Sequence, residues 1–361
     1  MKKRVILITA CLLASVLMVT ALAAGDAGDP LISLSYLTEV FTKQVDQKVE
    51  EKLDVSDTTI LGGDTSLPDT SIARTWTETR LKAQDVLLGT TGTSVMVLAG
   101  KAEVSFPFGT VVDVTTGTAV TTGTALALNH RYMVAEDTSA LFQITSKTAV
   151  VDYQGSYAFS YSDTVDYNAI AYALKTMHLF KGSFTGYGQG YDLEAAPTRL
   201  QALIMFIRVL GEEDAALAYT GTHPFTDIAK GTQADKYVGY AYAKGYTNGY
   251  SANTFRPSQA IPANQYMEFV LRAMGYSSSD NKTVSDALER ALASGVITAG
   301  EYTALKNGTF LRADLVYVSY YALDTQMALG GQTLRDVLLD RGVFTSAESR
   351  EADRLVSSGR I

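Results

Sequence analysis

Residues 196–211 read APTRLQALIMFIRVLG, and residues 261–275 read IPANQYMEFVLRAMG. The two stretches align on Gly211 and Gly275, and a third stretch, LRADLVYVSYYAL at 311–323, repeats the pattern in a worn form. Repeats of about 50 residues usually indicate stacked copies of one supersecondary unit, each too small to bury its own core. The sequence therefore predicts three helix-loop-helix copies, an arrangement typical of a binding module rather than of a catalytic scaffold.

The second copy is the most complete, and it occupies residues 223–276. It opens with Phe-Thr-Asp (225–227), continues through a Tyr/Ala-rich helix to Gly-Tyr-Thr-Asn-Gly-Tyr (245–250), and reaches its second helix after Phe-Arg-Pro (255–257). This order of motifs closely resembles the S-layer homology repeat of bacterial envelope proteins. The resemblance covers about residues 160–325. It implies three repeats packed as a pseudo-threefold unit, at 160–212, 220–276 and, in degenerate form, 277–330.

The N-terminal half differs from the repeats in composition and in the spacing of its apolar residues. Apolar residues recur at helical spacing between Leu34 and Leu53, so we expect one amphipathic helix within 24–53, either docked on the next domain or forming a short coiled-coil seam. Residues 54–72 look like a linker. Residues 73–152 combine Gly-Thr pairs with short apolar runs, which predicts a small all-β domain. This part resembles the region ahead of such repeats in clostridial surface proteins.

The expected fold class is therefore α+β. An N-terminal helix and a small β-rich domain are followed by three α-helical repeats, and residues 331–361 form two closing helices.

The first residues predict export. Cations at 2–4, an apolar run at 5–22 and the small-residue pattern at 21–23 together indicate a secretory signal peptide over 1–23. Residues 8–11 (Ile-Thr-Ala-Cys) also fit a bacterial lipidation box, but lipidation there would leave too short an apolar segment. No other apolar run is long enough for a transmembrane helix, so we expect a soluble or wall-associated protein after cleavage.

Composition excludes several classes of function. The single cysteine lies in the signal peptide, so the mature chain has neither disulfides nor a thiolate nucleophile. This suits the surface of a Gram-positive-type bacterium. The net charge is −8 and no basic stripe exists, which argues against nucleic acid as a partner. The same sign excludes non-specific attraction to an anionic cell wall, so binding to wall polymer requires a specific pocket.

In the family that the repeats resemble, grooves between copies bind secondary cell-wall polysaccharide. The binding motif opens the second helix as Thr-Arg-Ala-Glu. The first copy has Thr198-Arg199-Leu200-Gln201, and the third has Leu311-Arg312-Ala313-Asp314. The second copy has Pro262-Ala263-Asn264-Gln265 and has lost the arginine. A guanidinium matches a carboxylate as a planar fork of donors, so Arg199 and Arg312 are the expected ligand contacts.

Each of these positions also has a structural interpretation. Thr198 and Gln201 form a capping-box pattern, and Asp314 suits the first turn of a helix, so these residues are sensible in a helix that binds nothing. Asn248 and Tyr250 could line a sugar-binding groove, or their turn could be a helix C-cap around Gly249. These alternatives remain open at this point.

No catalytic motif, metal-binding pattern or phosphate loop occurs, so we expect neither enzymatic activity nor a cofactor. The histidines are scattered, and His178 is expected in the core, His130 in a turn and His223 at a repeat entry. The predicted function is that of a secreted surface protein, anchored noncovalently to wall polysaccharide. The alternatives are an S-layer or scaffold protein whose repeats bind other proteins, and a wall-associated hydrolase. The sequence leaves the oligomeric state and the identity of the glycan open.

Overall fold

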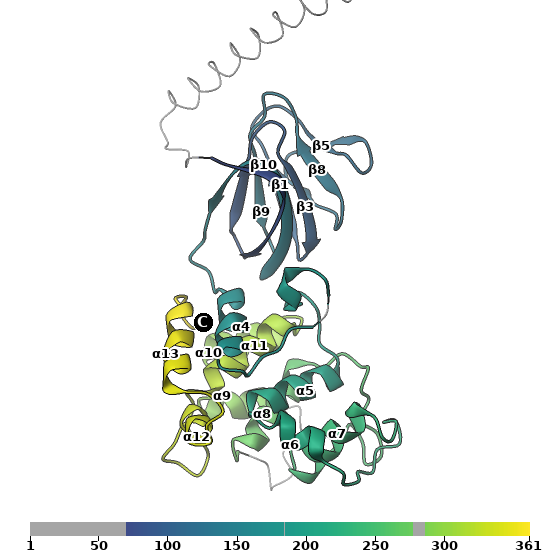
Figure 1. The fold of residues 1–361 in the computed structure, drawn as a ribbon, viewed down its shortest axis with the longest axis vertical. Coiled ribbons are helices and arrows are strands. Elements are labelled where there is room, and N and C mark those ends of the chain that lie inside the picture. Colours follow the sequence, from purple (N-terminus) through teal and green to yellow (C-terminus); the bar gives the residue numbers. More distant parts are fainter. Residues whose placement is uncertain (1–69, 184, 277–285) are drawn as a thin grey trace, which may run out of the picture. The chain divides into compact units, whose positions relative to one another are not determined.

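The computed structural model describes residues 70–183, 185–276 and 286–361. The predicted signal peptide (1–23), the amphipathic helix (24–53) and all but the last residues of the linker (54–72) lie outside these ranges. Strands come first along the described chain and helices follow (Figure 1). The strands are β1 (Ser71–Lys82), β2 (Val86–Gly89), β3 (Ser94–Ala99), β4 (Ala102–Ser105), β5 (Val111–Asp113), β6 (Thr118–Val120), β7 (Thr124–Ala125), β8 (Arg131–Val134), β9 (Ala140–Ile144) and β10 (Thr148–Ser160).

The helices of the described chain include a short 3-10 turn, η2 (Gly188–Gly190), close to the start of the helical part. The α-helices are α4 (Tyr167–Thr176), α5 (Arg199–Val209), α6 (Glu213–Ala218), α7 (Gln233–Ala243), α8 (Ala263–Ala273), α9 (Ala287–Ala293), α10 (Ala299–Asn307), α11 (Arg312–Ala322), α12 (Leu334–Asp340) and α13 (Ser346–Leu355).

All ten strands belong to one antiparallel sheet, in the order β6-β5-β8-β3-β10-β2-β9-β4-β7, with β1 paired to β10. Strand β10 is the centre of this sheet because its 13 residues pair with β1, β2 and β3. Its first half pairs with β3 through Val151 and Val97, and its second half pairs with β2 through Ala158 and Leu88. One long strand thus joins two groups of short strands, and the sheet curls into a nearly closed barrel (Figure 1).

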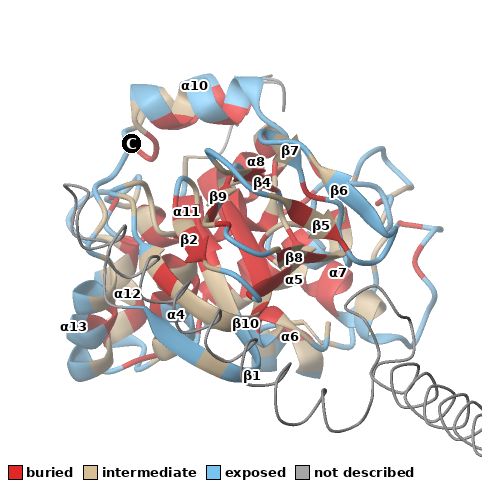
Figure 2. Cartoon of the chain, turned by 90° about the horizontal axis from the view of Figure 1, so that it is seen from above, coloured by how far each residue is buried: buried red, intermediate tan, exposed pale blue. Residues whose placement is uncertain are grey.

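The interior of the sheet is filled by alternate residues of its strands, as the two-residue period of a strand requires. In β4, for example, Ala102 and Val104 are buried while their neighbours are half-buried. Figure 2 shows buried positions along β8 and β9 and more exposed ones on β1 and β6. The core of the sheet consists of Leu81, Leu87, Val95, Val97, Ala102, Val104, Val111, Leu126, Tyr132, Val134, Ala140, Phe142, Ile144, Ala149, Val151 and Tyr153.

The helices share a second core, in which α5 contacts α7, α8 and α11. Large side chains such as Phe206, Tyr266 and Phe269 are fully or almost fully buried there. Threonine caps begin many of these helices, because a threonine hydroxyl accepts a hydrogen bond from a free first-turn amide. Complete capping boxes start α5 at Thr198 and α10 at Thr298.

The short helix α6 is tied to its neighbours by one carboxylate. Glu213 accepts hydrogen bonds from Lys181 (2.6 Å), Arg208 (2.8 Å) and the hydroxyl of Tyr237 (2.7 Å). Burial alone would raise the pKa of Glu213, but these three donors outweigh it and lower the pKa to about 2. The carboxylate is therefore ionised at any pH above that value.

The sheet and the helices are joined by charged side chains of the sheet. Arg80 of β1 donates to Asn168 Oδ1 (2.7 Å), to the carbonyl of Gly188 (3.0 Å) and to Glu194 Oε1 (2.5 Å). Lys147 forms an ion pair with Asp314, in the first turn of α11. Asp314 also accepts from the amide of Leu311 (2.9 Å), so its carboxylate is used in holding the structure together.

The predicted fold class is wrong. In place of a small β domain, the described chain has a ten-stranded, nearly closed sheet that extends from 71 to 160. The predicted domain ended at 152 because the tyrosine-rich residues after it read as a bridge. In the structure these residues continue β10, since a strand between paired neighbours accepts aromatic side chains on both faces.

The prediction of three helical repeats in a pseudo-threefold unit is wrong as well. The described chain has ten α-helices that do not divide into three like copies. Segments 160–212 and 220–276 differ from 277–330, where α10 takes the place of the loop that precedes the second helix. The capping box at Thr298 and Glu301 explains the extra helix, because it supplies a start signal that the earlier segments lack at this point.

Candidate functional site

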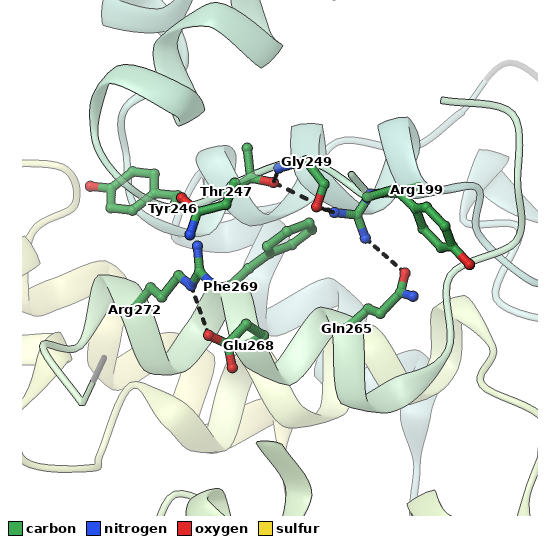
Figure 3. A pocket seen from close by; sticks show the side chains of 10 residues that line it. Arg199, Tyr246, Thr247, Gly249, Gln265, Glu268, Phe269 and Arg272 are labelled. Atoms are coloured by element: carbon green, nitrogen blue, oxygen red, sulfur yellow. Dashed lines mark hydrogen bonds and ion pairs between the residues drawn. The ribbon is translucent and has the colours of Figure 1, made fainter. Parts of the chain in front are cut away.

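A pocket of about 150 Å³ lies among the start of α5, the loop after α7 and one face of α8 (Figure 3). It is small, and charged side chains reach it from two helices. The residues that line it are Arg199, Tyr246, Thr247, Asn248, Gly249, Tyr250, Gln265, Glu268, Phe269 and Arg272.

The start of α5 positions Arg199. Thr198 caps the helix by accepting from the amide of Gln201 (3.2 Å), and the Gln201 side chain accepts from the amide of Thr198 (2.9 Å). The Arg199 amide donates to the carbonyl of Gln259 (2.8 Å). The backbone is thus fixed on both sides, and the side chain of the first helical residue points into the pocket (Figure 3).

The Arg199 side chain is held by neutral acceptors. Nη1 donates to Gln265 Oε1 (2.7 Å), and Nη2 donates to the carbonyl of Gly249 (3.1 Å). The guanidinium also lies over the rings of Phe255 (4.9 Å) and Phe269 (5.3 Å). Cation–π contacts of this kind stabilise a desolvated cation by about 1–2 kcal/mol. Among the described residues no carboxylate bonds to this arginine, although only 5% of it is exposed.

Burial, together with the nearby positive charge of Arg272, lowers the pKa of Arg199 to about 10. The side chain therefore still carries its charge at neutral pH, in surroundings that disfavour it. Its Nε–H group is buried and has no acceptor. A buried cation without an anion is a feature of sites that bind anions, although structural networks also shift pKa values.

The loop after α7 forms the opposite wall. The helix ends in a left-handed glycine, Gly245 (φ +73°), and the next amide, that of Tyr246, bonds back to the carbonyl of Ala241 (2.9 Å). This is the usual glycine-based C-cap. Gly249 is also left-handed (φ +83°), and a Cβ on it would lie 2.2 Å from a ring carbon of Phe225. Only glycine fits at that position, and its carbonyl is the one that Arg199 binds.

The face of α8 supplies a second cation and the one acid. Glu268, which is 4% exposed, accepts from Arg272 Nε (2.7 Å) and forms an ion pair with Arg290 of α9. One carboxylate is thus shared between two arginines. The residues that line the pocket thus carry two positive charges and one negative charge, in a chain whose net charge is −8.

The family model of the S-layer homology domain matches residues 224–261. The chain carries an S-layer homology domain. The matched residues include the loop wall of the pocket, from Tyr246 to Tyr250, whereas Arg199 and Arg272 lie outside the match. The recognition of this family from the Phe-Thr-Asp, Gly-Tyr-Thr-Asn-Gly-Tyr and Phe-Arg-Pro motifs is therefore confirmed.

A cell surface protein of Thermoanaerobacter kivui is 28% identical over 182 residues, which are 47% of this chain. The chain spans 23% of the length of that relative. Procruciferin, the 11S globulin of Brassica napus, aligns at 11% identity over 32% of this chain and 36% of its own, with a TM-score of 0.18. The recombinant pro-11S globulin of pumpkin aligns at 14% identity over 31% and 35%, with a TM-score of 0.17.

The structure brings together three of the predicted site residues and separates the others. Arg199, Asn248 and Tyr250 line the pocket beside the S-layer homology domain. Thr198 and Gln201 form the capping box that was one of their two interpretations, so that prediction is confirmed.

The remaining predicted site residues belong to α11, and they lie elsewhere. Arg312 is 4% exposed, its amide donates to the carbonyl of Ala195 (2.9 Å), and neither it nor Asp314 lines the pocket. Burial lowers the pKa of Arg312, against the opposing charge of Asp192. Asp314 is occupied by Lys147 and by its own helix start. Position in a sequence motif therefore did not determine position at the site.

Sequence reasoning missed the face of α8. Gln265, Glu268, Phe269 and Arg272 all line the pocket, and their spacing of three and four residues places them on one side of a helix. That spacing was visible in the sequence. The missing arginine of the second copy drew attention to the start of α8 instead, where Ala263 faces a wider hollow of about 620 Å³.

Nothing in the described ranges 70–183, 185–276 and 286–361 groups three metal-ligating side chains, and no helix there could span a membrane. The prediction that His178 lies in the core is wrong. Its side chain is 65% exposed and bonds to Glu348 (3.0 Å), because the residue takes a left-handed conformation (φ +63°) at the end of α4. His223 lies at the repeat entry, and its side chain, which is 4% exposed, bonds to Asp235 (2.8 Å).

Proposed function

We propose that this protein is a bacterial cell-surface protein that attaches noncovalently to the cell wall, without a catalytic role. In this proposal the pocket at Arg199 binds an anionic group of secondary cell-wall polysaccharide. The S-layer homology domain and the name of the Thermoanaerobacter kivui relative, a cell surface protein, support the location. The pocket supports the ligand class.

The observation that carries the proposal is the buried charge of Arg199. Two other largely buried arginines, Arg80 and Arg335, form ion pairs with Glu194 and Asp324. Arg312 is as buried as Arg199 and forms no ion pair with a described residue, but the negative charge of Asp192 lies near it, whereas the positive charge of Arg272 lies near Arg199. The acceptors of Arg199 are an amide, a hydroxyl and a carbonyl, all neutral. An anionic ligand would supply the missing charge, and Arg272 beside it would add a second donor.

The rim of the pocket suits a sugar. Tyr250 is 44% exposed, and the guanidinium of Arg256 lies 3.6 Å from its ring centre, which fixes the ring in place. A fixed aromatic face loses little conformational entropy when a flat apolar surface stacks on it. Asn248 is exposed next to it and carries both a hydrogen-bond donor and an acceptor.

The test is co-sedimentation of the full chain with purified walls of its source organism, before and after acid removal of the secondary polymer. We expect sedimentation with untreated walls and none with stripped walls. Arg199→Ala should abolish the sedimentation of the chain with untreated walls. The matched control is Arg354→Ala, which removes the same charge from a side chain that is 76% exposed and far from the pocket residues in sequence.

The outcomes separate the alternatives. Equal binding to stripped walls would reject the polysaccharide as ligand. Absence of wall binding together with self-assembly of the purified chain would favour a scaffold role. Loss of turbidity of the walls during incubation would indicate a hydrolase and contradict the proposal.

A further inference from the structure

Residues 360–361 contact the surface of the same chain formed by α10, α11 and the loop after α9, and both residues stay partly exposed to solvent. We call this contact surface the pocket of Arg360. Arg360 Nε donates to Glu301 Oε1 (2.6 Å), and Nη2 donates to Glu301 Oε2 (2.9 Å). The same Nη2 donates to the carbonyl of Val296 (2.8 Å), and the guanidinium lies 4.9 Å from the ring centre of Tyr321. A forked carboxylate contact, a carbonyl and an aromatic face together match a guanidinium and would not match an ammonium equally well.

The pocket is built around a buried acid. Glu301 is 2% exposed, and its only basic partner among the described residues is Arg360. Burial without a partner would disfavour the ionised carboxylate strongly, so the arginine is the group that this position requires. Glu301 also accepts from the Thr298 amide (2.8 Å), which holds the carboxylate at the start of α10.

The backbone of the next residue is bound as well. The amide of Ile361 donates to the hydroxyl of Tyr317 (2.8 Å), and its carbonyl oxygen accepts from Thr298 Oγ1 (2.5 Å). Gly300 lies against it, where a Cβ would come within 3.0 Å of Ile361. The pocket thus binds a guanidinium and also forms hydrogen bonds with the main chain that follows it. Peptide-binding sites commonly combine main-chain hydrogen bonds with a pocket for a side chain.

The segment that carries Arg360 is held to the rest of its chain by few hydrogen bonds, although Val356 at its start packs against the helical core. Residues 356–361 follow α13 without helix or strand. Between α13 and Arg360, the one side-chain bond of the segment is that of Ser358, whose hydroxyl accepts from the amide of Asp166 (3.1 Å). Nothing in this geometry requires that the occupant and the pocket belong to one chain.

We propose that the pocket formed by Val296, Thr298, Glu301, Tyr317 and Tyr321 is a binding site for an arginine-bearing extended peptide. It is occupied here by residues 360–361 of its own chain and, when it is vacant, takes the same segment of a second copy. The tether makes the occupant's effective concentration high, so the contact within one chain prevails while both parts are intact. Exchange between copies would join them without any new interface. This site is separate from the Arg199 pocket and does not depend on the function proposed for it.

The first experiment measures binding of a fluorescein-labelled, amidated peptide of residues 357–361 to three versions of the full chain by fluorescence anisotropy. Deletion of residues 357–361 and the substitution Arg360→Ala both vacate the pocket. We expect both of these chains to bind the peptide and the unaltered chain to bind it at least tenfold more weakly. A peptide with Arg360→Lys should also bind at least tenfold more weakly. Circular dichroism and the melting temperature establish that each chain is folded. If the deleted chain is unfolded, the Arg360→Ala chain provides the vacant pocket in its place.

The second experiment uses complementary chains. Glu301→Gln keeps the capping bond to Thr298 but removes the charge, so its own residues 360–361 are released. The deleted chain has a pocket but no occupant. When the two chains are mixed, we expect a one-to-one complex in sedimentation velocity, whereas each chain alone should keep the sedimentation coefficient that it has before mixing. The proposal is overturned if adding Glu301→Gln to the deleted chain leaves its affinity for the peptide unchanged, or if the mixture forms no complex.

Discussion

Replacement of Arg199 by methionine tests whether this arginine is kept for binding or for stability. Burial and the charge of Arg272 lower its pKa to about 10, well below the ordinary value of an arginine, and one pH unit corresponds to about 1.4 kcal/mol, so the protein disfavours the charge by about 3 kcal/mol at neutral pH. The sign follows from linkage. The folded protein binds fewer protons than the unfolded chain between pH 10 and 12.5, so this cost is fully present below pH 10 and disappears as the pH rises through that range.

Methionine removes this cost and also removes the donors. The carbonyl of Gly249 loses its partner, which costs about 1–3 kcal/mol for a buried acceptor, and Gln265 loses one hydrogen bond of about 1 kcal/mol. The two effects nearly cancel. We therefore expect the free energy of unfolding to change by less than about 2 kcal/mol in either direction, as measured by urea denaturation followed by tyrosine fluorescence.

Binding should respond quite differently. Truncation of one partner of a buried charge pair costs about 2–5 kcal/mol, so wall affinity should fall at least about thirtyfold. Arg312→Met is the matched control, because Arg312 is equally buried and holds the equivalent motif position but does not line the pocket. It should leave wall binding unchanged. A loss of more than about 4 kcal/mol in Arg199→Met would make the arginine a structural residue, and unchanged binding of the folded variant would refute the assignment of the site.

Three further predictions concern the pocket and the ion pairs of helix α6. Glu268→Gln leaves the charges of Arg272 and Arg290 without their shared acid, and should lower the free energy of unfolding by about 3–5 kcal/mol in urea titrations; a change below 1 kcal/mol would contradict the pairing. Gly249→Ala should destabilise the chain by more than about 1 kcal/mol and weaken wall binding, because a Cβ there would lie 2.2 Å from an aromatic carbon; normal stability and binding would show that the loop can move aside. The pKa of Glu213 is lowered to about 2, so its contribution to stability is present above the ordinary pKa near 4.5 and is lost as the pH falls toward 2; Glu213→Gln should remove that part of the acid dependence of the melting temperature, and an identical acid profile would argue against the three bonds to this carboxylate.

The sequence was informative wherever a local rule applied. Capping at Thr198 and Gln201 follows from the chemistry of a helix start, which involves neighbouring residues alone. The S-layer homology motifs could be recognised because the residues of each motif are adjacent in the sequence. The family model matches within the predicted second repeat. The Gly-Thr turns likewise indicated strands, although they did not show where the last strand would end.

The sequence was misleading about which residues line the pocket, because contacts between segments far apart in the chain determine this. Arg199 and Arg312 hold the same place in their motifs, yet only Arg199 lines the pocket. What separates them is which segment each one faces. The loop from Tyr246 to Tyr250 and the face of α8 meet Arg199, whereas Arg312 lies close to Asp192 and Glu194 of another loop.

By itself, therefore, the sequence determined the family, the presence of strands before helices and the local caps. Each of these depends on residues within one or two turns of one another. The tertiary structure alone decided that the strands form one nearly closed sheet, that the helical segments are not like copies, and that two arginines and one shared acid meet at a single pocket. The reason is that register, closure and burial depend on contacts between residues far apart in the chain, and no local pattern specifies them.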